Sequence, residues 1–287
     1  MMLVEETKAA TTAFSEQQGQ KGSKIGFVPT MGALHEGHLE LVRKARAEND
    51  IVICSIFVNP IQFNNSEDLE KYPRPLGADL EKLKSEGCDL VFIPSVEEMY
   101  PDEPEEEYDF GKLERVLEGK FRPGHFKGVA VVVKRLFSIV KPHRAYFGEK
   151  DFQQLQVIRK LVEMESLPVR IVPCPIVREP DGLAMSSRNM RLGPRSRKKA
   201  PFIFHTLNLA ASKIPGFSPD EVKNFVEQRF SEDQDFRLDY FDIVTMDNLE
   251  PVEKWSDSPD IIACIAVHLG GIRLIDNMIL FHNFALA

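Results

Sequence analysis

Short, mainly apolar runs rich in β-branched residues alternate along much of the chain with segments whose apolar residues recur at helical spacing. Ile51 to Val58 is one such run, and it is typical of a strand buried on both faces of a parallel sheet. An amphipathic helix with its apolar side in the core is predicted where apolar residues recur at i, i+3, i+4, i+7, i+8 and i+11, namely Val129, Val132, Val133, Leu136, Phe137 and Val140. The alternation predicts an α/β fold, a Rossmann-like parallel sheet flanked by helices.

The same pattern locates the other elements. A short strand follows Lys24, and helices are predicted over His38–Ala47, Leu76–Glu86 and Phe152–Glu165, with strands over Asp89–Ile93, Ala145–Phe147 and Val169–Val177. From Arg195 onwards we predict two helices and then three strands, over Arg195–Ser212, Pro219–Phe230, Leu238–Met246, Ile261–His268 and Ile272–Leu280. The chain should therefore form a Rossmann-like domain, residues 1–177, and a smaller C-terminal α+β cap domain, residues 178–287.

Composition narrows the class of protein. The 287 residues are 43% hydrophobic and 28% charged, which is enough for a large core. The net charge of −8 argues against a general nucleic-acid binder, although a local basic pocket remains compatible with it. The N-terminus is polar and the apolar runs are strand-sized, so neither a signal peptide nor a membrane span is expected. The acidic run from Asp102 to Glu107 is predicted to be a solvated loop.

The cysteines are those expected of a cytoplasmic protein. They lie far apart in the sequence, three of them in apolar segments, so they are predicted to be reduced core residues with neither disulfide nor zinc spacing: Cys54, Cys88, Cys174 and Cys264. A soluble, cytoplasmic protein with no nucleic-acid or membrane partner is expected.

The segment from Lys24 to His38 predicts a strand, a turn and the start of a helix. The first turn of a helix has unpaired N–H groups and the positive end of the helix dipole, so it can bind a phosphate. His35 and His38 lie on one side of that turn, and Gly37 would let a ligand approach. The spacing differs from the His-Glu-x-x-His of zinc proteases. By itself the pattern is equally compatible with two polar residues at a helix start.

Two further sites follow strand ends, where ligands bind in open α/β sheets. Gln62 comes after the run that ends at Val58, and it is either a substrate ligand or a solvated loop amide. Gly148 to Asp151 forms a turn between a strand and a helix, in which Lys150 could pair with phosphate or could be an ordinary solvated lysine.

Two loops contain small and basic residues. Arg122 to Gly128 has glycines and cations that could cover a phosphate or simply form a turn. Asp181 to Asn189 has small and hydroxyl residues around Arg188, which suits a mobile phosphate loop, an interdomain linker, or both.

The run Pro29 to His38, Pro-Thr-Met-Gly-Ala-Leu-His-Glu-Gly-His, resembles the nucleotide-binding signature of the pantothenate synthetase (pantoate–β-alanine ligase) family, a nucleotidyltransferase family with His-x-Gly-His at its first helix. The resemblance extends along nearly the whole chain, through the segments Phe57 to Phe63, Tyr72 to Arg74, Arg122 to Gly128, Phe147 to Gln154, Met185 to Asn189 and Arg273 to Asn277. Departures from the family pattern are modest: Val131 replaces an expected threonine, Ser138 replaces an asparagine, and residues 195–199 are unusually basic.

The resemblance implies roles for individual residues. Gln62 and Gln154 would bind pantoate, with Gln62 also near β-alanine, and His38 matches the family's proton donor. The ATP-contacting residues would be Met31, Gly32, Ala33, Leu34, His35, Glu36, Gly37, His38, Gly148, Glu149, Lys150, Asp151, Val177, Met185, Ser186, Ser187 and Arg188.

The implied reaction is an ATP-dependent condensation. Pantoate attacks the α-phosphate of Mg-ATP to give pantoyl adenylate and pyrophosphate, and β-alanine then displaces AMP to give pantothenate. The catalytic residues would be His35, His38, Lys150 and Arg188, with Mg²⁺ on the phosphates and no direct protein ligand predicted for it. The family also implies a homodimer. Two alternatives remain: a nucleotidyltransferase with another acceptor, and an ATP sensor without turnover.

Overall fold

The fold is described from a computed structural model, over residues 2–103 and 106–281. Its larger part is a six-stranded sheet with the order β1-β4-β3-β2-β5-β6, in which every neighbouring pair is parallel. The strands are β1 (Leu3–Glu5), β2 (Ile25–Thr30), β3 (Ile51–Ile56), β4 (Leu90–Phe92), β5 (Arg144–Gly148) and β6 (Arg170–Cys174). The predicted fold class, a Rossmann-like parallel sheet, is confirmed.

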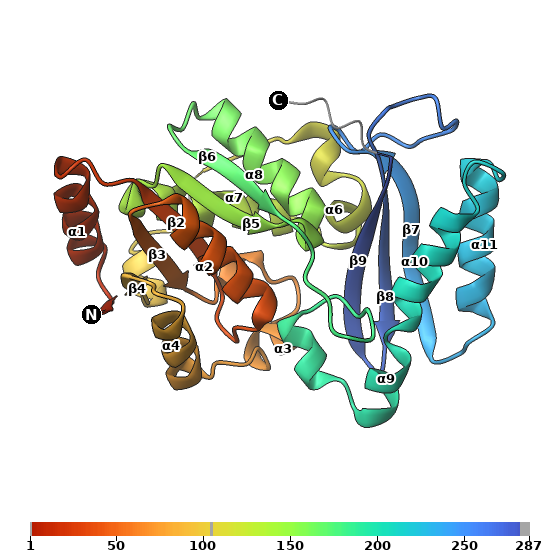
Figure 1. The fold of residues 1–287 in the computed structure, drawn as a ribbon, viewed down its shortest axis with the longest axis horizontal. Helices are drawn as coiled ribbons and strands as arrows, with labels where there is room; N and C mark the ends of the chain where they lie inside the picture. Colours follow the sequence, from red (N-terminus) through yellow and green to blue (C-terminus); the bar gives the residue numbers. More distant parts are fainter. Residues whose placement is uncertain (1, 104–105, 282–287) are drawn as a thin grey trace.

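Helices cover both faces of this sheet (Figure 1). Alternate residues of the central strands face opposite layers. Phe27 and Ile53 pack with α7 (His125–Val140) and α8 (Phe152–Met164), whereas Val28 packs with α2 (Glu36–Glu48) and α4 (Leu76–Ser85). The predicted core positions of α7 are buried. The remaining helices of this part are α1 (Lys8–Gln20), α3 (Ser66–Glu70), α5 (Val96–Met99) and α6 (Leu117–Phe121), with short 3₁₀ turns η1 (Pro60–Gln62), η2 (Gly111–Glu114) and η3 (Glu149–Asp151).

The C-terminal part is a separate antiparallel sheet with the order β7-β8-β9. Its elements are η4 (Ser187–Arg191), α9 (Pro194–Lys199), α10 (Phe202–Ser212), α11 (Pro219–Ser231), β7 (Phe236–Thr245), β8 (Ile261–Leu269) and β9 (Ile272–Phe281). One face packs against α10 and α11, and the other places Ile262 and Cys264 against Leu117 and Phe152 of the larger part (Figure 1). The predicted small α+β unit is confirmed, and its sheet lies directly beside the parallel-sheet part.

Several boundaries differ from the prediction. β1 and α1 were not predicted, because α1 buries Thr11 and Ser15 and has no apolar stripe to reveal it. α2 begins at Glu36 rather than His38, since His35 is the N-cap. β6 ends at Cys174, three residues before Val177. The helix predicted over residues 195–212 is two helices, with Pro201 at the break.

All four cysteines are buried and free, as predicted. Within the described residues, no helix is both long enough and apolar enough to cross a membrane. The acidic run predicted as a solvated loop lies partly outside the described residues, and its Glu106 pairs with Arg135 at 3.4 Å.

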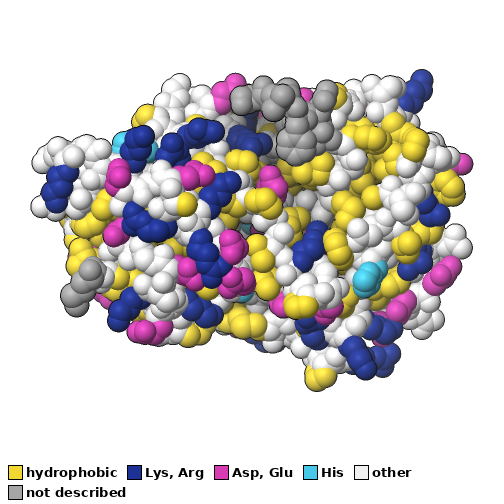
Figure 2. Space-filling model, in the orientation of Figure 1, with side chains coloured by type: hydrophobic (Ala, Val, Ile, Leu, Met, Phe, Trp, Pro, Cys, Tyr) yellow, Lys and Arg dark blue, Asp and Glu magenta, His cyan; other side chains and the backbone are white. Residues whose placement is uncertain are grey.

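Many charged side chains form ion pairs at the surface. Figure 2 shows acidic and basic side chains intermixed on the face that it presents. The basic segment 195–199 follows this pattern, because Arg195 and Lys199 pair with Asp235, and Arg197 pairs with Asp181.

Candidate active site

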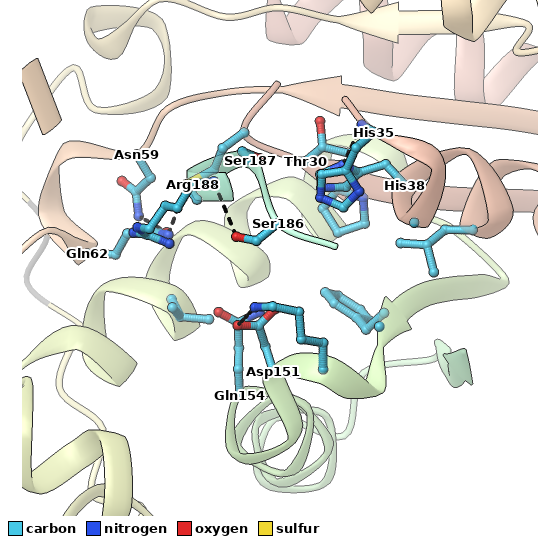
Figure 3. A pocket seen from close by; sticks show the side chains of 18 of the residues that line it. Thr30, His35, His38, Asn59, Gln62, Asp151, Gln154, Ser186, Ser187 and Arg188 are labelled. Atoms are coloured by element: carbon cyan, nitrogen blue, oxygen red, sulfur yellow. Dashed lines mark hydrogen bonds and ion pairs between the residues drawn. The ribbon is translucent and has the colours of Figure 1, made fainter. Parts of the chain in front are cut away.

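A cavity of about 230 Å³ opens at the carboxyl ends of the parallel strands. Thr30 ends β2, Asn59 follows β3, Gly148 ends β5 and Val177 follows β6, and all four line it. β2 lies between β3 and β5, so the strand order reverses here, and ligands bind at such switch points. In Figure 3, His35 and His38 lie on one side of the cavity, with Asp151 and Gln154 opposite.

The loop after β2 is held from behind by a buried carboxylate. Asp79 of α4 accepts hydrogen bonds from the backbone N–H groups of Ala33, at 2.7 Å, and Leu34, at 2.8 Å. Gly32 has a φ of +81°, which favours glycine, and a Cβ there would lie 3.2 Å from the same carboxylate. These N–H groups therefore face Asp79, and the loop presents the histidines that follow to the cavity.

The two histidines are stacked at the start of α2. Their ring centroids lie 4.1 Å apart, and Nδ1 of His38 accepts a hydrogen bond from the backbone N–H of His35. A Cβ at Gly37 would come within 3.0 Å of the His35 ring, so the glycine makes room for that ring. Burial, reinforced by Lys150, lowers the pKa of His35 to about 4. Burial and His35 lower the pKa of His38 to about 3. Both rings are neutral at pH 7.

Lys150 and Asp151 enter the cavity from η3, the turn between β5 and α8. Lys150 Nζ lies 3.5 Å from the carboxylate of Asp151. Desolvation opposes ionisation of Asp151, but the cations Lys150 and Arg188 outweigh it, so its pKa is lowered. An ammonium and an ionised carboxylate thus face the neutral histidines across the cavity.

Gln62 is fixed by several contacts in η1. Its Oε1 accepts from Nδ2 of Asn59 at 3.0 Å, and its Nε2 lies 3.2 Å from the sulfur of Met31. Its backbone carbonyl accepts a 2.8 Å hydrogen bond from Nδ1 of His125. Gly128 lets α7 approach closely, since a Cβ there would lie 2.6 Å from the carbonyl oxygen of Ile61. The amide is therefore oriented before any ligand binds.

Gln154, which the family resemblance assigns to pantoate, lies in the first turn of α8 and lines the same cavity. Its side chain makes no hydrogen bond to the described residues. Its amide is therefore available to a ligand, in contrast to that of Gln62.

The loop that leads into η4 closes another side of the cavity. Arg188 donates to Oδ2 of Asp68 in α3 at 2.8 Å, and Arg191 pairs with the other oxygen of the same carboxylate. The hydroxyl of Tyr72 lies 3.3 Å from that of Ser187. Residues 185–188 are thus held against the segment that follows β3.

The cavity brings together most of the predicted site residues. Those that line it are Met31, His35, Gly37, His38, Gln62, Gly148, Lys150, Asp151, Gln154, Val177, Met185, Ser186, Ser187 and Arg188. Five predicted residues lie outside the lining: Gly32, Ala33 and Leu34 in the loop after β2, Glu36 at the start of α2, and Glu149 in η3.

Other lining residues were not singled out from the sequence. They include Asn59 and Tyr72, which lie inside segments that were noted, and an apolar wall from α7 formed by Val129, Val132, Val133 and Leu136. The helical spacing of these apolar residues identified them as core, and only their place at the strand ends gives them a second role as cavity wall. Neutral imidazoles, an ammonium and a guanidinium can together stabilise an anionic phosphate, and the two glutamine amides can bind hydroxyl and carboxylate groups.

Similarity to known proteins extends over almost the whole length of the chain. A family model described as pantoate-beta-alanine ligase matches residues 3–279. A pantothenate synthetase from Azobacteroides pseudotrichonymphae genomovar. CFP2 is 52% identical over 260 residues, covering 90% of this chain and 93% of that protein. A pantothenate synthetase from Thermotoga neapolitana is 49% identical over 281 residues, covering 97% of this chain and 100% of that protein.

Solved structures show the same similarity. Pantothenate synthetase from Thermus thermophilus superposes with a TM-score of 0.91 at 44% identity, covering 98% of this chain and 100% of that one. Pantoate-beta-alanine ligase from Francisella tularensis, complexed with beta-gamma ATP and beta-alanine, superposes with a TM-score of 0.80 at 35% identity, covering 98% of each chain.

Proposed function

The chain belongs to the pantoate–β-alanine ligase family and is a ligase, and on this premise we propose that its cavity joins pantoate to β-alanine through a pantoyl-adenylate intermediate, with ATP as co-substrate. The solved relative complexed with beta-gamma ATP and beta-alanine supports ATP and β-alanine as substrates here. The products are pantothenate, AMP and pyrophosphate.

The reaction has two displacements. A carboxylate oxygen of pantoate attacks the α-phosphorus of ATP, forming an acyl–phosphate bond while the bond to the pyrophosphate oxygen breaks. The amine of β-alanine then attacks the acyl carbon, loses a proton and expels AMP. Neither step needs a covalent bond to the protein, so positioning and charge stabilisation supply the catalysis.

The cavity offers a group for each task. Lys150 would pair with the phosphates as a point charge, and the neutral rings of His35 and His38 would donate hydrogen bonds to oxygens on which charge develops. Arg188 would add a second cation once phosphate competes with Asp68 for its guanidinium. Gln62 and Gln154 would bind the hydroxyls and carboxylate of pantoate. Amides orient this carboxylate without neutralising it, so it remains a nucleophile.

We also propose that Mg²⁺ accompanies ATP. The cavity wall contains oxygen donors of the kind that Mg²⁺ prefers, the carboxylate of Asp151 and the hydroxyls of Ser186 and Ser187, so the residues present fit such an ion. When bound on the phosphates, Mg²⁺ would neutralise part of their charge.

The observation that carries the proposal is the convergence of the histidine pair after β2, Lys150 after β5 and two glutamines on one cavity. The adenylate route is tested with pantoate that contains ¹⁸O in its carboxylate. If the carboxylate attacks the α-phosphorus, one labelled oxygen remains with AMP after β-alanine displaces it. Unlabelled AMP from a completed reaction would exclude the acyl adenylate.

We propose three broader features of the protein as well. A domain boundary near residues 177–178 is supported by separate hydrophobic clusters, two of which extend no further than Cys174 and a third of which begins at Leu183. A cytoplasmic location is supported by four free, buried cysteines. The family resemblance implies a homodimer, which sedimentation equilibrium would test by giving a mass of twice 32.6 kDa.

A further inference from the structure

The turn that carries Lys150 is held by a residue of the C-terminal sheet. The side-chain Nδ2 of Asn277, on β9, donates to the backbone carbonyls of Glu149, at 2.8 Å, and Lys150, at 2.9 Å. An amide nitrogen has two hydrogens, so one can serve each carbonyl. Asn277 is 4% exposed, and these hydrogen bonds are therefore shielded from competition with water.

Asn277 is itself held in a rigid setting. The neighbouring Asp276 accepts its backbone N–H at 2.8 Å and forms a two-pronged ion pair with Arg178, at 2.6 and 3.0 Å. β9 also pairs with β8 along its length, with Asn277 opposite Cys264. The side-chain amide of Asn277 is thus a fixed point against which η3 is placed.

The side chain of Lys150 has few contacts of its own that fix its position. Its ammonium has one ion-pair partner among the described residues, Asp151 on the same turn, at 3.5 Å. A partner on the same turn moves with it, so the position of the ammonium in the cavity depends on where the backbone of η3 is held. Asn277 lies outside the lining of the main cavity and reaches the turn from behind.

We propose that Asn277 is a positioning residue for Lys150: it fixes the backbone of η3 so that the ammonium meets the phosphates of the nucleotide, although Asn277 does not itself touch the nucleotide. This inference rests on the proposed function of Lys150. Through Asn277 the C-terminal sheet would help to build the phosphate site, although Asn277 lies 127 residues from Lys150 in the sequence.

The test is a double-mutant cycle of Asn277→Ala and Lys150→Ala, with kcat, KM for ATP, KM for β-alanine and the melting temperature measured for all four proteins. Asn277→Ala alone should lower kcat/KM for ATP by about 10- to 100-fold, the range for a misplaced catalytic group. KM for β-alanine should change much less. In the Lys150→Ala background, Asn277→Ala should have almost no further effect on ATP use.

Each of the other outcomes rejects one part of the proposal. If Lys150→Ala leaves ATP use unchanged, the role of Lys150 is wrong and the positioning role falls with it. If Lys150 matters but Asn277→Ala costs the same with and without it, or leaves ATP use at the parent level, Lys150 keeps its role and Asn277 does not position it. If the alanine variant fails to fold, Asn277→Ser, which keeps one donor, replaces it in the cycle.

A matched control is Asn208→Ala. Asn208 lies exposed on α10, where its Nδ2 donates to the backbone carbonyl of Phe204 at 2.9 Å. Its removal deletes the same kind of hydrogen bond at a residue outside the lining of the cavity, and ATP use should stay at about the parent level.

Discussion

The ring of His38 accepts a hydrogen bond through Nδ1 from the backbone N–H of His35, over 3.3 Å. With a pKa of about 3 the ring is neutral at pH 7, so its single proton is on Nε2. His38 therefore offers a fixed N–H donor to a ligand, and in the proposed reaction it would act on developing phosphate charge as a neutral donor. The acidic imidazolium form is not populated near pH 7 in the free protein.

His38→Ala should slow adenylation by about 10²–10³-fold, the range for losing one preorganised donor. Single-turnover formation of pantoyl adenylate and pyrophosphate from labelled ATP and pantoate, with β-alanine left out, measures this step. His205→Ala, which changes an exposed histidine on α10, is the control and should keep the parent rate. A folded His38→Ala protein that adenylates at the parent rate would show that His38 is structural.

Acid should destabilise the protein through its buried histidines. Burial and nearby cations lower the pKa of His125 to about 4, alongside His35 at about 4 and His38 at about 3. The unfolded chain takes up protons near pH 6.5, whereas the folded chain does so only near these lower values. Stability is thus fully present above pH 6.5 and is lost as the pH falls, by about 1.4 kcal/mol per pH unit for each histidine.

Urea unfolding at a series of pH values between about 6 and 4.5, inside the window that the lowered histidine pKa values define, measures this slope. In His38→Gln the slope should be smaller by the contribution of one proton, whatever the change in overall stability. An unchanged slope would mean that His38 titrates normally in the folded chain.

Lys150→Ala should impair the use of ATP far more than the use of β-alanine, because a neutral side chain leaves phosphate charge uncompensated in a partly dry cavity. The ratio of the two kcat/KM values, each measured with the other substrates saturating, reports the difference. Lys198→Ala provides a control at a lysine of the surface segment 195–199. Equal losses for ATP and β-alanine would indicate a general folding defect instead.

Gln62→Ala and Gln154→Ala should each weaken pantoate binding by roughly 1–3 kcal/mol, the cost of leaving a buried polar partner unpaired. Asn59 holds the amide of Gln62 in place, so Asn59→Ala should weaken pantoate binding as well. Calorimetric titration with pantoate measures the loss, and ATP binding without pantoate should hardly change. Parent-like pantoate affinity in the Gln62→Ala, Gln154→Ala protein would remove the substrate assignment.

Local patterns in the sequence predicted much of the fold and part of the site. The run from Ile51 and the helical spacing around Val129 are signals contained within one element, and both elements are present. His38 and Lys150 could be placed at one cavity because each follows a buried strand. The N-terminal strand and helix were missed because α1 buries polar residues.

The supporting contacts could not be predicted in this way. Asp79 orients the loop after β2 from 46 residues away, and Asn277 holds the Lys150 turn from 127 residues away. A hydrogen bond between distant segments leaves no periodic trace in either of them. The family resemblance assigns Ala33 and Leu34 to the nucleotide, and nothing in the sequence indicates that their backbone N–H groups are bonded to Asp79.

The most direct measurement is the exchange of labelled pyrophosphate into ATP, because it reports reversible adenylation of the acid before β-alanine takes part. With pantoate present and β-alanine absent, the label should enter ATP, and without pantoate it should not. Exchange that depends on a different acceptor would indicate another nucleotidyltransferase activity. A folded protein that binds ATP but shows no exchange with pantoate would contradict the adenylate mechanism.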